Sequence, residues 1–131
     1  MGNECIFCKI VAGEIPSKKL YEDEKFLAFL DIRPASKGHT LVIPKAHSET
    51  FLDMPDADEK EMFAVVQKLG KKLKNSLNAK LIFLLVMGEE VAHTHVHLLP
   101  FYGEEFPVGL KGSKEMDLDT VLEEINAEKE G

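Results

Sequence analysis

Three of the chain's five histidines stand at every second position, as His93, His95 and His97 in the stretch VAHTHVHLLP. Because alternate side chains of a β-strand point to the same side, a strand over residues 91–100 would carry all three imidazoles on one face. Val96 would then lie on the opposite, buried face. Three explanations fit such a row: histidines with ordinary structural partners, a metal site, and a site for phosphoryl chemistry.

The three explanations differ in how many of the histidines they use. Polar side chains in a packed strand need partners, which makes an ordinary structural role for all three hard to sustain. In a metal site, a His-x-His pair would bind one zinc ion, with Glu89 or Glu90 as nearby carboxylates. In a phosphoryl-transfer site, one imidazole attacks phosphorus while its neighbours bind the non-bridging oxygens. His39, in KGHTLVIP, would join that cluster from another strand, whereas the zinc interpretation leaves it unexplained.

The neighbouring sequence predicts the helices that would position these histidines. The clearest helix begins at Asp56, whose side chain can cap it, with Glu59 completing a capping box. It continues as an apolar stripe of helical spacing, formed by Met62, Val65, Val66, Leu69 and Leu73. Two shorter helices are predicted, one over residues 5–13 that ends at Gly13 and one over 118–127.

Short apolar runs predict five strands, at residues 20–22, 25–31, 39–44, 81–87 and 91–100. The loop that ends at Gly38 is rich in turn-forming residues and indicates antiparallel pairing of the two strands around it. Strands in meander pairs with one inserted helix are typical of α+β folds. The sequence therefore predicts an α+β fold with an antiparallel five-stranded sheet, one long helix and two shorter helices.

Length and charge narrow the classes of function. A chain of 131 residues fits a single domain over residues 1–131. Its formal net charge of −7 repels phosphate backbones, so we expect no nucleic-acid partner, although a small phosphorylated ligand can bind in a local site. No apolar run is long enough to span a membrane, and the N-terminus lacks the layout of a signal peptide. We therefore expect a cytoplasmic location and no membrane partner.

The residues around the histidines resemble those of the histidine-triad (HIT) superfamily. Its signature is three histidines that alternate with apolar residues, and residues 93–99 here read His-Thr-His-Val-His-Leu-Leu. The resemblance extends upstream through IFCKIVAGEIPS, YEDEKFLAFLDIRP and KGHTLVIPKAH. It implies a HIT-like α+β fold whose sheet joins that of a second copy in a homodimer. It also implies cleavage at the α-phosphate of an AMP-like purine nucleotide, such as a nucleoside phosphoramidate or a dinucleoside polyphosphate.

The resemblance also implies roles for individual residues. His95, the middle histidine, would be the nucleophile, and the histidines that bind or orient the phosphate would be His39, His97 and His93. Asp31 would accept the ribose hydroxyls, although a turn-forming role at the end of a strand explains it equally well. The apolar pocket for the base would be formed by residues that otherwise read as ordinary core: Phe7, Ile10, Ile15, Phe29 and Ile32.

The segment before the histidines departs from the pattern of the Hint-like branch of this family. Many Hint-like members carry Asn-x-Gly and then Gly-Gln-Ser or Gly-Gln-Thr there, whereas this chain has the shorter MGEEVA at residues 87–92. The amide and hydroxyl that would help to protonate the leaving group are missing. Two alternatives therefore stay open beside the nucleotidyl hydrolase: a metal-dependent hydrolase with zinc on the triad, and a non-catalytic nucleotide sensor.

A Cys-x-x-Cys pair, Cys5 and Cys8, stands at the start of the first predicted helix. Thioredoxin-type redox pairs follow a strand, which is missing here, and a structural disulfide does not suit the cytoplasm. A zinc site would need two further ligands. Bacterial HIT proteins that begin with the same motif imply a structural zinc held by Cys5, Cys8, His47 and His93. Zinc-bound His93 would be neutral and could not act as the acid.

Overall fold

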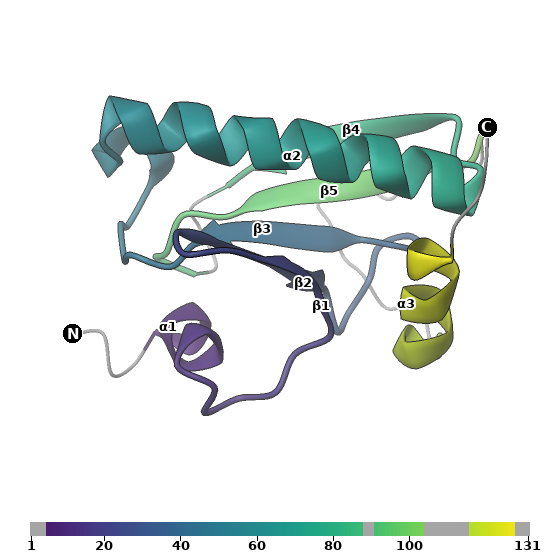
Figure 1. Cartoon of the computed structure of the whole chain (residues 1–131), viewed down its shortest axis with the longest axis horizontal. Coiled ribbons are helices and arrows are strands. Elements are labelled where there is room, and N and C mark those ends of the chain that lie inside the picture. Colours follow the sequence, from purple (N-terminus) through teal and green to yellow (C-terminus); the bar gives the residue numbers. More distant parts are fainter. Residues whose placement is uncertain (1–4, 88–90, 104–115, 128–131) are drawn as a thin grey trace.

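The computed structural model describes residues 5–87, 91–103 and 116–127. In chain order its elements are α1 (Ile6–Val11), β1 (Lys19–Glu22), β2 (Phe26–Leu30), β3 (Thr40–Pro44), the 3-10 helix η2 (Phe51–Asp53), α2 (Asp56–Leu77), β4 (Leu81–Val86), β5 (Val96–Phe101) and α3 (Leu118–Asn126) (Figure 1). None of the helices within the described ranges is both long enough and apolar enough to cross a membrane.

The five strands form one antiparallel sheet in the order β1-β2-β3-β5-β4. β2 and β3 are buried along their whole length, which explains why their sequences are continuous apolar runs and not alternating patterns. β1 and β4 are the edge strands and remain partly exposed. The predicted α+β fold with a five-stranded antiparallel sheet is confirmed.

The two faces of the sheet carry different layers. One face packs against α2 and α3, where Val96 and Leu98 of β5 meet the apolar stripe of α2. The other face packs against α1, which contributes Phe7 and Ile10. Figure 1 shows α2 and α1 on opposite sides of the sheet. Because His97 alternates with Val96 and Leu98, it lies on the α1 face.

The histidine strand is shorter than the sequence predicts. β5 begins at Val96, the point where its ladders to β3 and β4 both end. His93 and His95 therefore precede the strand, and only His97 lies in it. The amide of Thr94 donates outside the sheet, to a carbonyl in the loop that follows β3, over 2.8 Å. The prediction of a continuous strand over 91–100 is wrong for its first part, because the ladder pairs of β5 with β3 and β4 begin only at Val96.

The predicted cap of α2 is also wrong. Asp56 is the first helical residue and Pro55 occupies the N-cap position, where no side chain caps the helix. Asp56, Asp58 and Glu59 instead place negative charge in the first turn, which favours the helix dipole. The antiparallel pairing predicted for the strands around the loop that ends at Gly38 is confirmed for β2 and β3. Gly38 itself has a φ of +89°, and a β-carbon there would collide with Leu77 of α2.

Candidate active site and metal centre

His39 and His97 form a buried pair on the α1 face, with 2% and 9% of their surfaces exposed. Nδ1 of His39 lies 3.0 Å from the amide nitrogen of Ala35. An amide can only donate, so Nδ1 accepts and the neutral ring carries its proton on Nε2. That Nε2–H donates to Nδ1 of His97 over 2.9 Å. The proton of neutral His97 is therefore on its own Nε2, which is left as a hydrogen-bond donor.

His95 takes the opposite tautomer. Its Nδ1 lies 2.7 Å from the backbone oxygen of His93. A carbonyl only accepts, so Nδ1 carries the proton and Nε2 keeps its lone pair. The ring is held edge-on between Phe7, with ring centroids 5.1 Å apart, and His97, at 5.0 Å. His95 therefore presents a basic nitrogen beside the donor of His97.

Burial keeps the His39–His97 pair uncharged. The pKa of His97 is lowered to about 3, because burial disfavours the protonated ring and His39 adds repulsion. Burial also lowers the pKa of His39, although the carboxylate of Asp31 acts in the opposite direction. At neutral pH the pair therefore offers an anionic ligand a hydrogen-bond donor and no positive charge.

The arrangement of these three rings can support attack on phosphorus. An imidazole lone pair is a competent nucleophile, and a fixed donor beside it can bind the oxygens on which negative charge develops. After attack the ring of His95 would be positively charged, and its Nδ1–H would already face the His93 carbonyl. Each of these rings is held by hydrogen bonds from within the protein, as catalysis by preorganised dipoles requires.

Asp31 forms a turn and also lies close to the histidine pair. Its Oδ1 accepts the amide hydrogen of Arg33 over 2.8 Å, a turn-forming contact directly after β2. Its Oδ2 lies 3.6 Å from Nε2 of His39, too far for a hydrogen bond. Asp31 therefore lies beside the His39–His97 pair with one carboxylate oxygen free of a short hydrogen bond among the described residues.

The structure brings together most of the apolar residues expected around the base. Phe7, Ile10 and Phe29 belong to one buried cluster beneath α1, and Ile15 packs at its edge. Ile32 does not join them, because it follows the turn at the end of β2 and is 77% exposed. The expected contact of Ile32 with the base therefore stays a prediction, and the structure places this side chain apart from the buried cluster.

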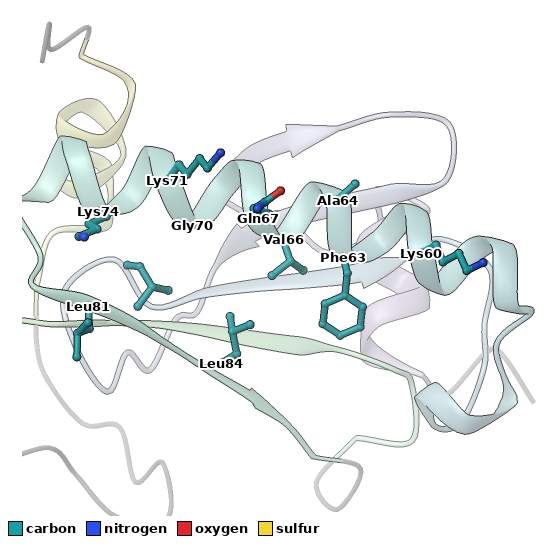
Figure 2. A pocket seen from close by; sticks show the side chains of 11 residues that line it. Lys60, Phe63, Ala64, Val66, Gln67, Gly70, Lys71, Lys74, Leu81 and Leu84 are labelled. Carbon is teal, nitrogen blue, oxygen red and sulfur yellow. The ribbon is translucent and has the colours of Figure 1, made fainter.

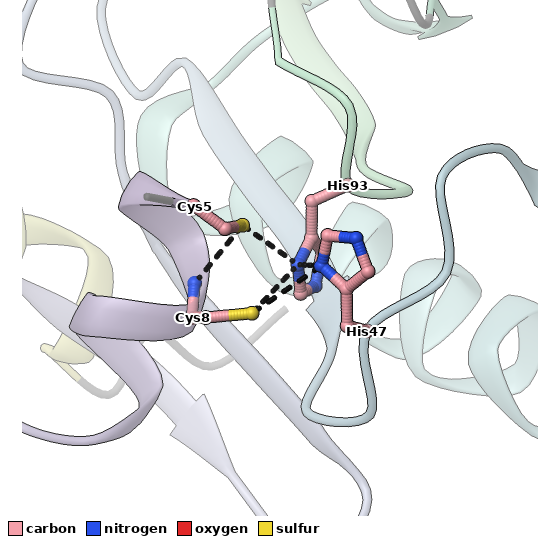
Figure 3. Close-up of side chains that lie close together, drawn as sticks. All are labelled: Cys5, Cys8, His47 and His93. Atoms are coloured by element: carbon pink, nitrogen blue, oxygen red, sulfur yellow. Dashed lines mark hydrogen bonds between the residues drawn. The ribbon is translucent and has the colours of Figure 1, made fainter. Parts of the chain in front are cut away.

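Four potential metal ligands converge beside α1, from three separate segments: Cys5, Cys8, His47 and His93 (Figure 3). Nδ1 of His93 lies 3.2 Å from Sγ of Cys5, 3.5 Å from Sγ of Cys8 and 3.1 Å from Nδ1 of His47. All four ligand atoms lie within 4.8 Å of one another. Two thiols and two imidazoles in this arrangement match the ligand set of a tetrahedral structural zinc site.

The second nitrogen of His93 strengthens the fit to a metal. Its Nε2 lies 2.8 Å from the backbone oxygen of Pro44, which can only accept, so Nδ1 turns its lone pair toward the thiols. A ligating histidine usually donates its other N–H to such an oxygen. Because both ring nitrogens of His93 are engaged here, the expected role of this ring in binding phosphate is not supported by the geometry.

A second group of possible ligands, Asp31, His39 and His97, also converges. A metal on Nε2 of His39 would require the proton of the neutral ring to be on Nδ1. Nδ1 instead accepts the amide hydrogen of Ala35, so the tautomer opposes metal binding. The geometry thus disfavours a metal held by Asp31, His39 and His97, whereas the Cys5 cluster keeps its ligand nitrogen, Nδ1 of His93, turned toward the thiols.

A protein-family model described as the HIT domain matches residues 12–104 of this chain. The chain belongs to the HIT family. The resemblance seen in the sequence is therefore confirmed at the level of the family, while the Hint-like branch stays a prediction. Cys5 and Cys8 lie before the part of the chain that the HIT model matches.

Relatives of this HIT protein include proteins with and without a named activity. An uncharacterised HIT-like protein of Methanocaldococcus jannaschii is 49% identical over 92% of this chain and 98% of that protein. An adenosine 5′-monophosphoramidase of Schizosaccharomyces pombe is 40% identical over 81% and 80% of the two chains. The crystal structure of a zinc-bound histidine triad family protein from Mycobacterium smegmatis matches with a TM-score of 0.83 at 32% identity, over 95% and 92% of the two chains.

Several groups that position the histidines of this HIT domain could not be predicted from the sequence. The backbone atoms of Ala35, Pro44 and His93 fix three tautomers, and every residue has such atoms, so no sequence signal marks them. Ser48 was also missed: its Oγ lies 2.8 Å from Oγ1 of Thr94, and its carbonyl accepts the Thr94 amide. Its position next to His47 was the one available signal.

Proposed function

We propose that this HIT protein is a nucleotide-binding hydrolase or transferase that cleaves at the α-phosphate of nucleoside phosphoramidates or dinucleoside polyphosphates. His95 acts as the nucleophile through a nucleotidyl-histidine intermediate. The observation that carries the proposal is the 2.7 Å contact between Nδ1 of His95 and the oxygen of His93, which leaves the Nε2 lone pair available. A relative named as an adenosine 5′-monophosphoramidase supports the same substrate class.

In the first step, the Nε2 lone pair of His95 forms a bond to the α-phosphorus, and the bond from phosphorus to the leaving amine or phosphate breaks. The leaving group takes both electrons of that bond together with a proton. Nε2–H of His97 donates to a non-bridging oxygen, and His39 holds His97 in the tautomer that makes this possible. The positive charge on the nucleotidyl-His95 ring is stabilised by the His93 carbonyl.

In the second step, a water oxygen attacks the same phosphorus and the phosphorus–Nε2 bond breaks. Nε2 recovers its lone pair, the nucleoside monophosphate leaves, and a proton is released. The proton that the leaving group takes up in the first step and the proton that water releases in the second both exchange with solvent. Glu89 and Glu90, the nearest carboxylates in sequence, lie outside the described residues.

The nucleotide itself is held by groups around this centre. Asp31 accepts the ribose hydroxyls through its Oδ2, which faces the histidine pair. Phe7, Ile10, Ile15 and Phe29 provide apolar surface for an AMP-like purine, whereas Ile32 could reach the base only from its exposed position after the turn. Apolar surface discriminates little between bases, so the ribose and the α-phosphate supply most of the specificity.

A structural zinc ion is the cofactor that the Cys5–His93 cluster best fits. Bound there, zinc would supply a rigid cross-link between α1, the loop after β3 and the segment before β5, and no step of the reaction uses it. Free thiols at Cys5 and Cys8 suit a reducing compartment such as the cytoplasm, in which a disulfide would not compete with the metal. The zinc-bound relative supports the same inference.

The homodimer implied by the resemblance is proposed to form through β4 and α2. β4 ends the strand order of the described sheet, and its Leu81 and Leu84 are 52% and 51% exposed. Phe63 of α2 and Leu84 of β4 line one groove of about 580 Å³. Figure 2 shows these two side chains between the helix and the strands. An open edge strand with apolar side chains is a surface prone to pair with another strand. A second copy related by two-fold symmetry would cover it.

The test is release of AMP from adenosine 5′-phosphoramidate by wild-type protein and by His95→Ala, each with and without chelation of zinc. We expect turnover by the wild type and none by the variant, with AMP still bound by both. Binding of AMP without turnover by the wild type would favour the nucleotide sensor. Complete loss of turnover on chelation, in a protein that stays folded, would favour the metal-dependent hydrolase.

A further inference from the structure

His93 belongs both to the candidate metal centre at Cys5 and Cys8 and to the candidate active site at His95. Its side chain turns Nδ1 toward the thiols of Cys5 and Cys8, and its backbone oxygen receives Nδ1–H of His95. Any movement of the His93 backbone therefore changes the group that selects the tautomer of His95. The candidate metal centre and the candidate nucleophile are thus separated by a single residue, Thr94.

The segment that carries these residues is not secured by the sheet. His93, Thr94 and His95 precede β5, and their anchors are individual hydrogen bonds. Nε2–H of His93 donates to Pro44 O, and the Thr94 amide donates to Ser48 O. Ser48, which accepts the second of these hydrogen bonds, is next to His47, another potential metal ligand. A metal bound by His47 and His93 would therefore hold the residues on both sides of the Thr94–Ser48 hydrogen bond.

Phe7 makes a second link between the two centres. It lies in α1 between Cys5 and Cys8, and its ring contacts both histidines edge-on, with centroids 5.8 Å from His93 and 5.1 Å from His95. α1 has six residues, too few to be stable without tertiary contacts. Besides its apolar contacts, the helix is linked to the segment before β5 by the contacts of Cys5 and Cys8 with His93. A metal at these ligands would therefore also hold Phe7 in place beside His95.

We propose that the Cys/His metal centre positions the nucleophile, with Phe7 and the backbone of residues 93–95 coupling metal occupancy to the reactive geometry of His95. The proposal rests on the proposed function in one respect, that His95 is the reacting histidine. Phe7 is in this sense a positioning residue. Loss of the metal leaves the sheet folded but lets α1 and the 93–95 segment relax, so that His95 samples both tautomers and its Nε2 is a free nucleophile for only part of the time.

The test uses histidine labelled with ¹⁵N, because the nitrogen chemical shifts of His95 report which nitrogen carries the proton at fixed pH in the ligand-free protein. We expect a single Nδ1–H tautomer in the zinc-loaded wild type and averaged shifts after chelation. Zinc-loaded Phe7→Leu, which keeps all four ligands, should also show averaged shifts. Ile6→Ala changes an exposed side chain on the same helix and should match the wild type.

Kinetics on the same proteins give the expected size of the effect. Outer positioning groups typically contribute 10- to 100-fold, so we expect kcat to fall about tenfold in Phe7→Leu with little change in KM. An unchanged Nδ1–H tautomer in Phe7→Leu, indistinguishable from Ile6→Ala, would overturn the coupling even if chelation unfolds the wild type. Failure of the proposed function has a different signature, because the wild type would then show no turnover or His95→Ala would retain it, whatever the tautomer of His95 in the wild type.

Discussion

Nδ1 of His95 lies 2.7 Å from the backbone oxygen of His93, two residues earlier in the same chain. In a continuous strand this contact could not form, because the carbonyl would point toward a neighbouring strand and the imidazole would stand perpendicular to the sheet. The start of β5 at Val96 therefore has a chemical consequence. It releases the His93 carbonyl from the ladder and lets it fix the tautomer that leaves Nε2 of His95 free.

Substitutions at His97 and His39 should affect turnover unequally. His97 offers its Nε2–H to the substrate, so His97→Ala should lower kcat by about 10²–10³, as the loss of one oxyanion donor does elsewhere. His39 acts through His97, so His39→Ala should cost only about 10- to 100-fold. Steady-state kinetics with adenosine 5′-phosphoramidate measure both. A larger loss of kcat in His39→Ala than in His97→Ala would contradict the proposal that His39 acts only through His97.

Asp31→Asn should separate ribose binding from the turn. The new side chain keeps the Oδ1 that accepts the Arg33 amide, so the fold should be retained. It loses the charge with which Oδ2 would accept ribose hydroxyls, a contact worth about 1.5–3 kcal/mol, and kcat/KM should fall about 10- to 100-fold. The wild type should prefer ribonucleotide over 2′-deoxyribonucleotide substrates, and the variant should lose that preference. Equal discrimination by both proteins would show that Asp31 serves only the turn.

Stability should fall in acid because of His97. In the unfolded chain its pKa is near 6.5, and in the folded protein it is about 3. Between these values the unfolded state binds more protons, so the free energy of unfolding decreases as pH falls, by about 1.4 kcal/mol per unit for one full proton. Above pH 6.5 this contribution is constant. Urea unfolding at pH 7 and pH 5 measures the difference.

The matched variant for this prediction is His97→Asn. Other groups also titrate in the same range, including His39, whose pKa burial lowers as well. Comparing the two proteins cancels those contributions. The number of protons taken up on unfolding, obtained from the change of the free energy of unfolding with pH, should be smaller by up to one in the variant. Parallel pH dependences for wild type and variant would show that His97 is not the buried neutral group described here.

The oligomeric state should depend on Leu84. A charge at this exposed position of β4 would be buried without a partner in a dimer formed through that strand, so Leu84→Glu should be monomeric. Leu52→Glu is the control, since Leu52 is 78% exposed and belongs to η2, outside β4 and α2. Sedimentation equilibrium distinguishes the cases. A dimeric Leu84→Glu, or a monomeric Leu52→Glu, would place the interface elsewhere.

Most of the fold could be predicted because the spacing of apolar residues within each segment indicates whether it forms a helix or a strand. The apolar stripe from Met62 to Leu73 specifies α2, and the runs around Phe29 and Val42 specify buried strands. The histidine segment was misassigned because alternating polar and apolar residues look the same whether or not a neighbouring strand is present. Asp56 was taken as a cap because its type suits either the cap or the first turn.

The site could be predicted as a set of residue types but not as a set of tautomers. The roles of His95 and of the Cys5 cluster followed from resemblance, and the structure adds their spatial convergence. Which nitrogen of each ring carries a proton depends on backbone atoms of Ala35, Pro44 and His93, to which the sequence gives no clue. The exposure of Ile32 is likewise not predictable from its apolar type, because it depends on the turn at Asp31.

The central claim is that His95 forms a covalent bond to the α-phosphorus, and trapping that intermediate tests it most directly. Wild-type protein would be mixed rapidly with adenosine 5′-phosphoramidate, quenched at high pH to preserve a phosphorus–nitrogen bond, digested, and sequenced by mass spectrometry. We predict an adenylyl group on His95, formed before steady state and absent from His95→Ala. An adduct on another residue, or turnover with no adduct at any time during a rapid-quench series, would contradict the account.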